Sequence, residues 1–150
     1  MAMRIPPGLV ALAGGVAIWS IARYVPASRV VVPGSRVMAI VLGGIGVALT
    51  LLGVASFLRA RTSVDPLHPE KASTLVVTGI YRFTRNPMYL GFALMLLALA
   101  VRLSVWPGGL VVAVFVVYMN RFQIRPEENA LDAQFGDAAR AYRRSVRRWI

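Results

Sequence analysis

The 150-residue chain has the length of one domain, but its composition is not that of a soluble domain. Apolar residues make up 57% of the sequence and charged residues 15%, whereas average globular domains contain about 45–50% and about 25% of these classes. A chain this apolar is too hydrophobic to be disordered. Its 17 Lys and Arg against 6 Asp and Glu give a net charge of +11. Basic domains that bind nucleic acid lack such long apolar runs, so we expect no nucleic acid partner and predict an integral membrane protein.

Cysteine and histidine usage excludes several kinds of chemistry. The sequence has no Cys and one His, which excludes disulfides, thiol nucleophiles and cysteine–zinc sites. The single His68 stands beside Pro69 in a polar stretch, and we interpret it as a solvated loop residue rather than a ligand. We therefore predict no metal site. Any chemistry must use Tyr, Arg, Asn, Gln or Glu side chains, backbone groups and a bound cofactor.

Four uncharged apolar segments predict an all-α membrane protein with about four transmembrane helices. They cover residues 5–22, 37–58, 87–101 and 103–120. The second is long enough to cross a hydrocarbon core about 30 Å thick. We interpret the first as a retained helix rather than a signal peptide, because no convincing small-residue cleavage site follows it. The third is short, so we predict that the third and fourth helices form a tight hairpin turning between Arg102 and Gly109.

The distribution of basic residues predicts the topology of a single, multi-pass domain covering residues 1–150. Most Lys and Arg residues lie between residues 59 and 86 or after residue 120, and the positive-inside rule places such segments in the cytoplasm. We therefore expect both chain ends in the cytoplasm. The predicted organisation is transmembrane helices 1 and 2 in 1–58, a cytoplasmic loop in 59–86, helices 3 and 4 in 87–120, and cytoplasmic tail helices in 121–150.

The third apolar segment opens with the helix-start pair Asn86 and Pro87. Asn suits the N-cap and Pro the first helical position. One interpretation is a well-capped helix with Tyr81 and Tyr89 in the aromatic belt of the membrane interface. The other is that the free N–H groups and positive dipole end of this helix, beside two arginines, hold an anionic group such as a carboxylate.

A second helix start follows Pro126, with Glu127 and Glu128 in the first turn. We interpret these acids either as solvated helix-start residues or as groups that grip hydroxyls or a cation. Beyond them, an apolar stripe predicts an amphipathic C-terminal helix lying on an anionic leaflet. The stripe consists of Leu131, Phe135, Tyr142, Val146 and Trp149. We assign the surrounding arginines to membrane-surface attraction rather than to ligand contacts; they are Arg140, Arg143, Arg144, Arg147 and Arg148.

Two motifs carry a resemblance to a known family. Residues 79–91 read G-I-Y-R-F-T-R-N-P-M-Y-L-G, and residues 127–136 read E-E-N-A-L-D-A-Q-F-G, followed by Tyr142. They resemble the G-x-Y-x-x-x-R-[HN]-P-x-Y-x-G and E-E-x-x-L-x-x-x-F-G signatures of isoprenylcysteine carboxyl methyltransferases and related phospholipid methyltransferases. The resemblance covers about residues 60–150. It implies methyl transfer from S-adenosylmethionine to a lipophilic acceptor in the bilayer, within a membrane-embedded helical fold that has no Rossmann domain.

The resemblance also implies a set of site residues. The cofactor contacts that it implies are Ser73, Thr74, Leu75, Val76, Tyr81, Asn86, Pro87, Met88, Tyr89 and Glu127. Glu127 and Glu128 are the implied catalytic acids if the acceptor is an amine that must lose a proton. A carboxylate acceptor is already ionised at neutral pH and needs no such help.

The acceptor side of the site departs from the family pattern. Gln123 stands where carboxyl-methylating members place an Arg that faces the substrate. Arg121 and Arg125 lie two positions away, which on a helix points them to other faces. We take these three residues as the expected acceptor contacts. Asn86 also replaces the His found in many members.

Three functional hypotheses follow. The first is isoprenylcysteine carboxyl O-methylation or a similar reaction. The second is N-methylation of a phospholipid amine, or methylation of another small lipophile. The third is a non-catalytic membrane scaffold that has lost turnover, which Gln123 and the short chain support.

Overall fold

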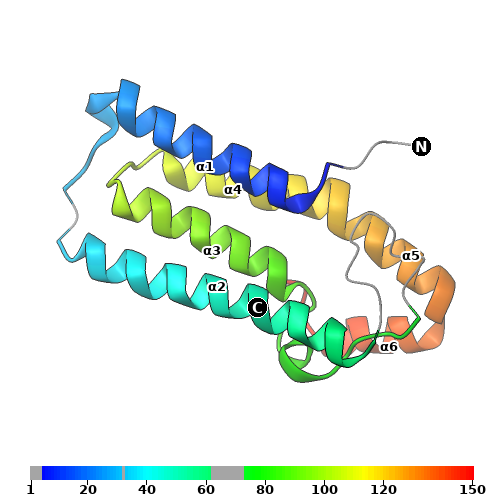
Figure 1. Ribbon diagram of the computed structural model, residues 1–150. Helices are drawn as coiled ribbons and strands as arrows, with labels where there is room; N and C mark the ends of the chain where they lie inside the picture. The colour runs from blue at the N-terminus through cyan, green and yellow to red at the C-terminus, as the bar shows by residue number, and fades with distance from the viewer. Residues whose placement is uncertain (1–4, 32, 62–72) are drawn as a thin grey trace.

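The computed structural model describes residues 5–31, 33–61 and 73–150, and the long elements within these ranges are all helices (Figure 1). The prediction of an all-helical fold is therefore confirmed. The interpretation of His68 lies outside the described residues. The α-helices are α1 (Pro7–Tyr24), α2 (Ser35–Arg59), α3 (Pro87–Arg102), α4 (Gly108–Tyr118), α5 (Arg125–Phe135) and α6 (Asp137–Ser145). The shorter elements are the 3-10 turns η1 (Pro26–Ser28) and η3 (Gly79–Arg82) and the π-helical η4 (Met119–Ile124).

Two of the described helices, α1 and α2, are long and apolar enough to cross a membrane. The outer side of α2 is apolar: Val37, Ile40, Leu51 and Leu58 are each more than 60% exposed. Such a large exposed apolar surface is suited to contact with lipid rather than water. Helices α3 and α4, with 16 and 11 residues, are shorter.

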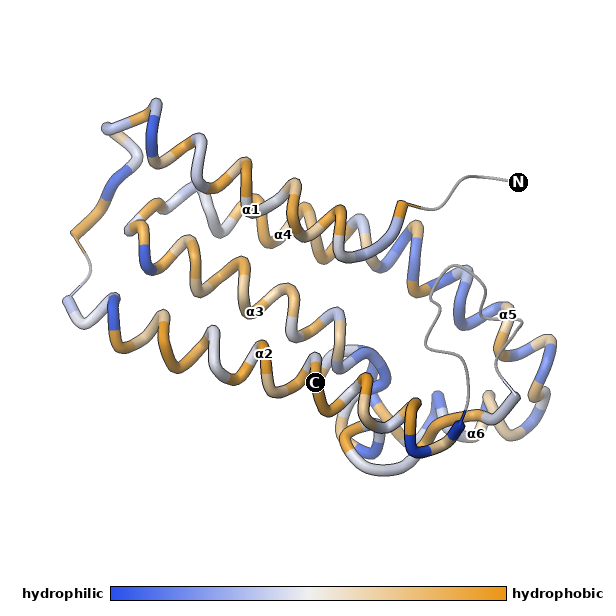
Figure 2. The backbone as a smooth tube through the Cα atoms, in the orientation of Figure 1, coloured by the Kyte–Doolittle hydropathy of each residue, from blue (hydrophilic) through white to orange (hydrophobic). Residues whose placement is uncertain are grey.

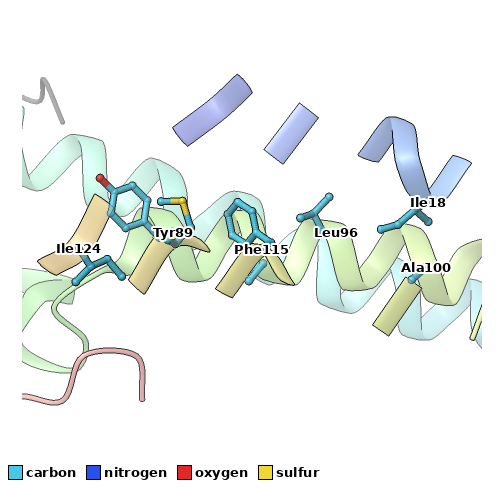
Figure 3. Packing of buried hydrophobic residues seen from close by; sticks show 8 residues of the cluster. Ile18, Tyr89, Leu96, Ala100, Phe115 and Ile124 are labelled. Carbon is cyan, nitrogen blue, oxygen red and sulfur yellow. The ribbon is translucent and has the colours of Figure 1, made fainter. Parts of the chain in front are cut away.

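Helix α3 lies at the centre of the fold, with α2 on one side and α1 and α4 on the other (Figure 1). Its buried residues Tyr89, Ala93, Leu96 and Ala100 recur every three or four positions, which places them on one face of the helix. This face packs against buried residues of α1, α4 and η4 (Figure 3). The partners in this core cluster are Ile18, Phe115, Met119 and Ile124.

Glycines allow α2 and α3 to approach each other closely. A Cβ placed on Gly46 would lie 2.7 Å from the carbonyl oxygen of Gly91, closer than side chains ordinarily come. The hydroxyl of Thr50 also donates a 3.0 Å hydrogen bond to the carbonyl of Gly46 within this contact. Small residues at a helix crossing permit such backbone contact, which is a common way for membrane helices to associate.

The fourth predicted helix differs from the structure at both ends. It begins at Gly108 rather than Leu103, because residues 103–107 form the turn that follows α3, with Ser104 at a positive φ of 55°. It does not end at Asn120, since α4 runs through η4 directly into α5. Within η4 the chain widens, and the N–H of Arg125 donates to the carbonyl of Asn120. The next residue, Pro126, has no N–H to donate and its ring crowds the carbonyl four positions earlier, so a wider turn accommodates it.

The prediction of one amphipathic C-terminal helix is wrong. Gly136 adopts φ 55° and ψ −123° and separates α5 from α6. This conformation is essentially restricted to glycine, which has no Cβ. Helix α6 then ends at Ser145, and Val146 is extended. The predicted stripe is therefore divided among two helices and an extended segment.

Polar residues gather at one end of the fold. In Figure 2 the hydrophilic positions concentrate on α5, on α6 and around the segment before α3, whereas α1 to α4 are largely apolar along their length. The two sequence motifs lie at this polar end, because one precedes and opens α3 and the other opens α5.

Candidate functional site

The side chains of Tyr89, Gln123 and Glu127 form a hydrogen-bonded cluster at the polar end of the helices. The Tyr89 hydroxyl donates to Oε1 of Glu127 at 2.5 Å, and Nε2 of Gln123 donates to the same oxygen at 2.8 Å. Gln123 and Glu127 are four residues apart on one continuous helix, so they share a face. Tyr89 and Gln123 are only 5% and 2% exposed. Two buried neutral donors therefore orient the Glu127 carboxylate.

Tyr81 lies beside this cluster, in η3. Its ring packs edge-on against Phe57 of α2, with ring centroids 5.4 Å apart and planes at 82°. Its carbonyl accepts a 2.6 Å hydrogen bond from the hydroxyl of Tyr142 in α6. Burial raises the pKa of the Tyr81 hydroxyl well above its ordinary value, and Tyr142 and Glu127 add to the shift. Tyr81 therefore keeps its proton at neutral pH and is suited to act as a hydrogen-bond donor rather than a base.

Helix α3 begins as the sequence predicts, with Asn86 at the N-cap and Pro87 as the first helical residue. The Asn86 side chain, however, makes no capping hydrogen bond. Instead its Nδ2 donates to the backbone carbonyl of Arg148 at 2.9 Å. Asn86 is 9% exposed. Its amide thus ties the C-terminal segment to the start of α3 rather than satisfying the helix end.

Glu128 is the centre of an ion-pair cluster. Its Oε1 lies 3.0 Å from Nη1 of Arg85. The guanidinium of Arg148 binds both carboxylate oxygens, with distances of 3.1 Å from Nε to Oε1 and 2.7 Å from Nη2 to Oε2. The side chain of Glu128 is only 13% exposed. Burial lowers the pKa of Arg85, and Glu128 opposes that shift. Nη1 of Arg143 is a third, longer contact, 4.0 Å from Oε2. The structure therefore gives this predicted catalytic acid three guanidinium partners.

The assignment of Arg143 and Arg148 to the membrane surface is wrong, because both side chains bind acids of α5. Nη1 of Arg143 lies 2.9 Å from Oδ2 of Asp132, and Arg148 turns inward to Glu128. Sequence reasoning missed this contact although a signal was present. Adjacent residues on a helix point about 100° apart, so Glu127 and Glu128 cannot both face the same group. The acid pointing away from the Tyr89 cluster then needs cationic partners of its own if it is buried.

The C-terminal segment after α6 lies along the start of α3. The N–H of Arg85 donates to the carbonyl of Arg147 at 3.0 Å. The indole N–H of Trp149 donates to Oδ1 of Asn120 in η4 at 3.1 Å, and its ring packs against the core cluster. The segment that the sequence predicted to be membrane-surface helix is thus part of the wall around the site.

The remaining predicted residues are distributed unevenly. Val76 and Pro87 are buried, Leu75 and Met88 are partly buried, and Ser73 and Thr74 are exposed. Arg121 and Arg125 are exposed, unlike Gln123 between them, as helix geometry predicts. The Arg121 guanidinium lies 5.8 Å from the centroid of the Phe122 ring. The structure therefore brings Gln123 to the Tyr89 cluster and leaves the two arginines on the outer surface.

Comparisons with known proteins place these features in a family. Residues 35–138 match the family model described as phospholipid methyltransferase. A 63-residue stretch, 42% of this chain, is 43% identical to an uncharacterized protein of Haemophilus influenzae, whose whole length it covers. No solved structure matches. Residues 35–138, which match the family model, include both motifs and the Tyr89–Gln123–Glu127 cluster, and they make up more than half of the chain. The chain therefore belongs to the phospholipid methyltransferase family, which indicates a membrane methyltransferase.

Proposed function

We propose that this protein transfers a methyl group from S-adenosylmethionine to a lipophilic acceptor at the cytoplasmic face of a membrane. In this proposal α1 to α4 span the bilayer, with α5, α6 and the segment before α3 on the cytoplasmic side. The observation that carries the proposal is the Glu127 carboxylate, held by Tyr89 and Gln123 at the polar end of apolar helices.

The chemistry of the described side chains fits the proposed cofactor. An oriented carboxylate such as Glu127 accepts hydrogen bonds from hydroxyl or ammonium groups. Aromatic rings such as Tyr81 and Tyr89 attract a cation such as a sulfonium. The first N–H groups of α3, those of Met88 and Tyr89, have no carbonyl in their own helix to bind, and they suit a carboxylate. When bound, S-adenosylmethionine would supply an activated methyl group.

The contacts of the two acids support a carboxylate as acceptor. Glu127 already accepts two hydrogen bonds, and Glu128 is paired with Arg85 and Arg148. These contacts favour a role for both acids in holding partner groups over one in removing a proton from an amine. A carboxylate needs no such step, so alignment of the reactants and exclusion of water would provide most of the rate enhancement. We therefore propose carboxyl O-methylation resembling that of isoprenylcysteine carboxyl methyltransferases.

A second candidate, N-methylation of a phospholipid amine, has one observation in its favour. Gln123 is neutral and binds Glu127, so this position offers no positive charge to a carboxylate acceptor. An amine acceptor has no need of that charge.

Binding of S-adenosylhomocysteine, measured by calorimetry on purified protein in lipid nanodiscs, tests the cofactor site. We expect Glu127→Gln to weaken binding about tenfold or more, because a charged acceptor is lost at unchanged shape. Asp137→Asn is the matched control, since the Asp137 side chain is 97% exposed. Equal affinities for wild type and Glu127→Gln would refute the assignment of Glu127 to the site.

The acceptor is tested with methyl-labelled S-adenosylmethionine and two probes, a prenylated cysteine and phosphatidylethanolamine. A methyl ester releases its label as methanol in base, whereas an N-methyl group does not. Base-labile label on the prenylated cysteine would support the first candidate, and base-stable label on phosphatidylethanolamine the second. Binding of S-adenosylhomocysteine without label in these probes or in a total lipid extract would support a non-catalytic scaffold instead.

A further inference from the structure

The backbone of Arg148 is fixed to the residues that open α3. Its carbonyl accepts a hydrogen bond from Nδ2 of Asn86 at 2.9 Å. The hydroxyl of Thr84 lies 3.4 Å from the same carbonyl oxygen, and it also accepts a 3.2 Å hydrogen bond from the N–H of Asn86. Thr84 is 4% exposed and Asn86 9%. One carbonyl after α6 is therefore bound by two buried side chains of the first sequence motif.

The side chain of Arg148 binds the other half of the site. Its Nε and Nη2 lie 3.1 Å and 2.7 Å from the two carboxylate oxygens of Glu128. Its Nη1 lies 3.5 Å from Oδ1 of Asn120 in η4, and the indole N–H of Trp149 donates to that same oxygen at 3.1 Å. Arg148 therefore binds the start of α3 with its backbone, and η4 and the first turn of α5 with its side chain.

The elements that Arg148 joins are also those that carry the hydrogen bond between Tyr89 and Glu127. Asn86 is the N-cap of α3, and Tyr89 lies in the first turn of the same helix. Glu128 follows Glu127 directly in α5. The Tyr89 hydroxyl is 2.5 Å from Oε1 of Glu127, and hydrogen bonds of this type extend to about 3.0 Å. A separation of the two helix starts by about 1 Å would therefore break this bond.

Neutralising the charge of Glu128 does not by itself explain Arg148. Nη1 of Arg85 already lies 3.0 Å from Oε1 of Glu128, and Nη1 of Arg143 lies 4.0 Å from Oε2. Arg148 adds a two-point contact, in which a planar guanidinium meets both carboxylate oxygens and fixes the angle between the two groups. The Glu128 side chain is 13% exposed, so water competes little for this contact. The contact therefore fixes position as well as charge.

We propose that Arg148 is a positioning residue of the cofactor site, which holds the start of α3 against the first turn of α5. It acts through the hydrogen bond between Tyr89 and Glu127, which in turn orients the carboxylate toward S-adenosylmethionine. This inference rests on the proposed function. The residues that match the phospholipid methyltransferase family end at residue 138, so that match assigns Arg148 no role.

The test measures the affinity for S-adenosylhomocysteine by calorimetry, on protein in lipid nanodiscs. We expect Arg148→Ala to weaken binding about tenfold, because charge-assisted hydrogen bonds that fix the two helix starts are lost. Arg148→Lys should fall between Arg148→Ala and wild type, since an ammonium keeps the charge but not the two-point geometry. Arg144→Ala is the matched control. It removes the same charge from the end of α6, its side chain is exposed, and its affinity should equal that of wild type.

A second comparison separates positioning from general stabilisation. Arg148→Ala is also made in the background of Tyr89→Phe, where the hydrogen bond to Glu127 is already absent. If Arg148 acts through that bond, its loss should then weaken binding by less than about threefold, because residues in one network are not additive. A purely stabilising residue would weaken binding by the same factor in both backgrounds. Thermal unfolding checks that each variant folds, and Arg148→Lys replaces Arg148→Ala in the cycle if the alanine variant does not fold.

Three results would overturn the assignment. The first is an affinity for S-adenosylhomocysteine that is the same in wild type and both Arg148 variants. The second is full affinity in Arg148→Lys together with weak binding in Arg148→Ala, since charge alone would then suffice. The third is an equal factor in the wild-type and Tyr89→Phe backgrounds. Failure of the proposed function is distinct from all three, because wild-type protein would then bind no S-adenosylhomocysteine.

Discussion

The hydroxyl of Tyr89, in the first turn of α3, lies 2.5 Å from Oε1 of Glu127, near the start of α5. This hydrogen bond joins the two sequence motifs, which are 38 residues apart at these positions. Gln123 donates to the same oxygen from within a π-helical turn. π-helical turns frequently mark functional sites, and this one is next to the acid at the centre of the proposed cofactor site.

Replacing Tyr89 by Phe removes the hydroxyl donor and keeps the ring. We expect Tyr89→Phe to weaken binding of S-adenosylhomocysteine about tenfold, because a hydrogen bond to a charged group contributes about 1.5–3 kcal/mol and Gln123 retains part of the orientation. Calorimetry measures the change. Tyr24→Phe is the control, since Tyr24 is 73% exposed and lies at the C-terminal end of α1. Unaltered affinity in Tyr89→Phe would show that the hydroxyl does not position the carboxylate for the cofactor.

The ion pair between Glu128 and Arg148 is expected to stabilise the fold. A double-mutant cycle with Glu128→Gln and Arg148→Ala should give a coupling energy of about 2 kcal/mol in the free energy of unfolding, because both groups are largely withdrawn from solvent. The matched control is the exposed pair of Asp137 and Arg140, whose side chains are 97% and 49% exposed. Its coupling should be much smaller than that of the Glu128–Arg148 pair, because solvent screens exposed charges. Equal coupling energies for the two pairs would contradict the structural role of Glu128.

The close contact of α2 with α3 predicts different responses to two glycine substitutions. Gly46→Ala places a Cβ against the Gly91 carbonyl and should destabilise the protein by about 1–3 kcal/mol, because the two backbones must separate. Gly43→Ala places its Cβ 3.7 Å from the Ala98 side chain, an ordinary contact, and should be neutral or slightly stabilising. Thermal unfolding in the same detergent compares the two. A melting temperature of Gly46→Ala equal to that of Gly43→Ala is the result that contradicts this packing.

Burial of Tyr81 predicts loss of stability in alkali. Its pKa in the folded protein is raised above the ordinary 10.0, so above this pH the unfolded chain loses a proton that the folded protein retains. The contribution of the Tyr81 hydroxyl to the free energy of unfolding is therefore fully present below about pH 10, and it decreases as the pH rises further. Tyr81→Phe should flatten this decrease, measured as the melting temperature against pH, whereas Tyr24→Phe should leave it unchanged. An unchanged profile in Tyr81→Phe would show that another group causes the alkaline transition.

Local chemistry accounts for the parts of the fold that the sequence predicted. Asn86 and Pro87 open α3 because their preferences act within a single turn. Gln123 and Glu127 share a face because they are one turn apart. The apolar stripe ending at Trp149 predicted one helix incorrectly, because helical spacing places residues on one face only while the helix continues. Gly136, at a positive φ of 55°, ends α5 and so interrupts the stripe.

The sequence by itself determined the helical class, the start of α3, the four apolar segments and the two motifs. These features follow from composition and from contacts within a few residues. Only the tertiary structure decided that Glu127 faces Tyr89 while Glu128 faces Arg85 and Arg148. It also decided that the last residues return to the start of α3 rather than lying along a membrane. These contacts join residues far apart in the chain, and they depend on how α3, η4 and α6 converge. The packing of whole helices around the core brings these elements together, and a local sequence pattern does not predict that packing.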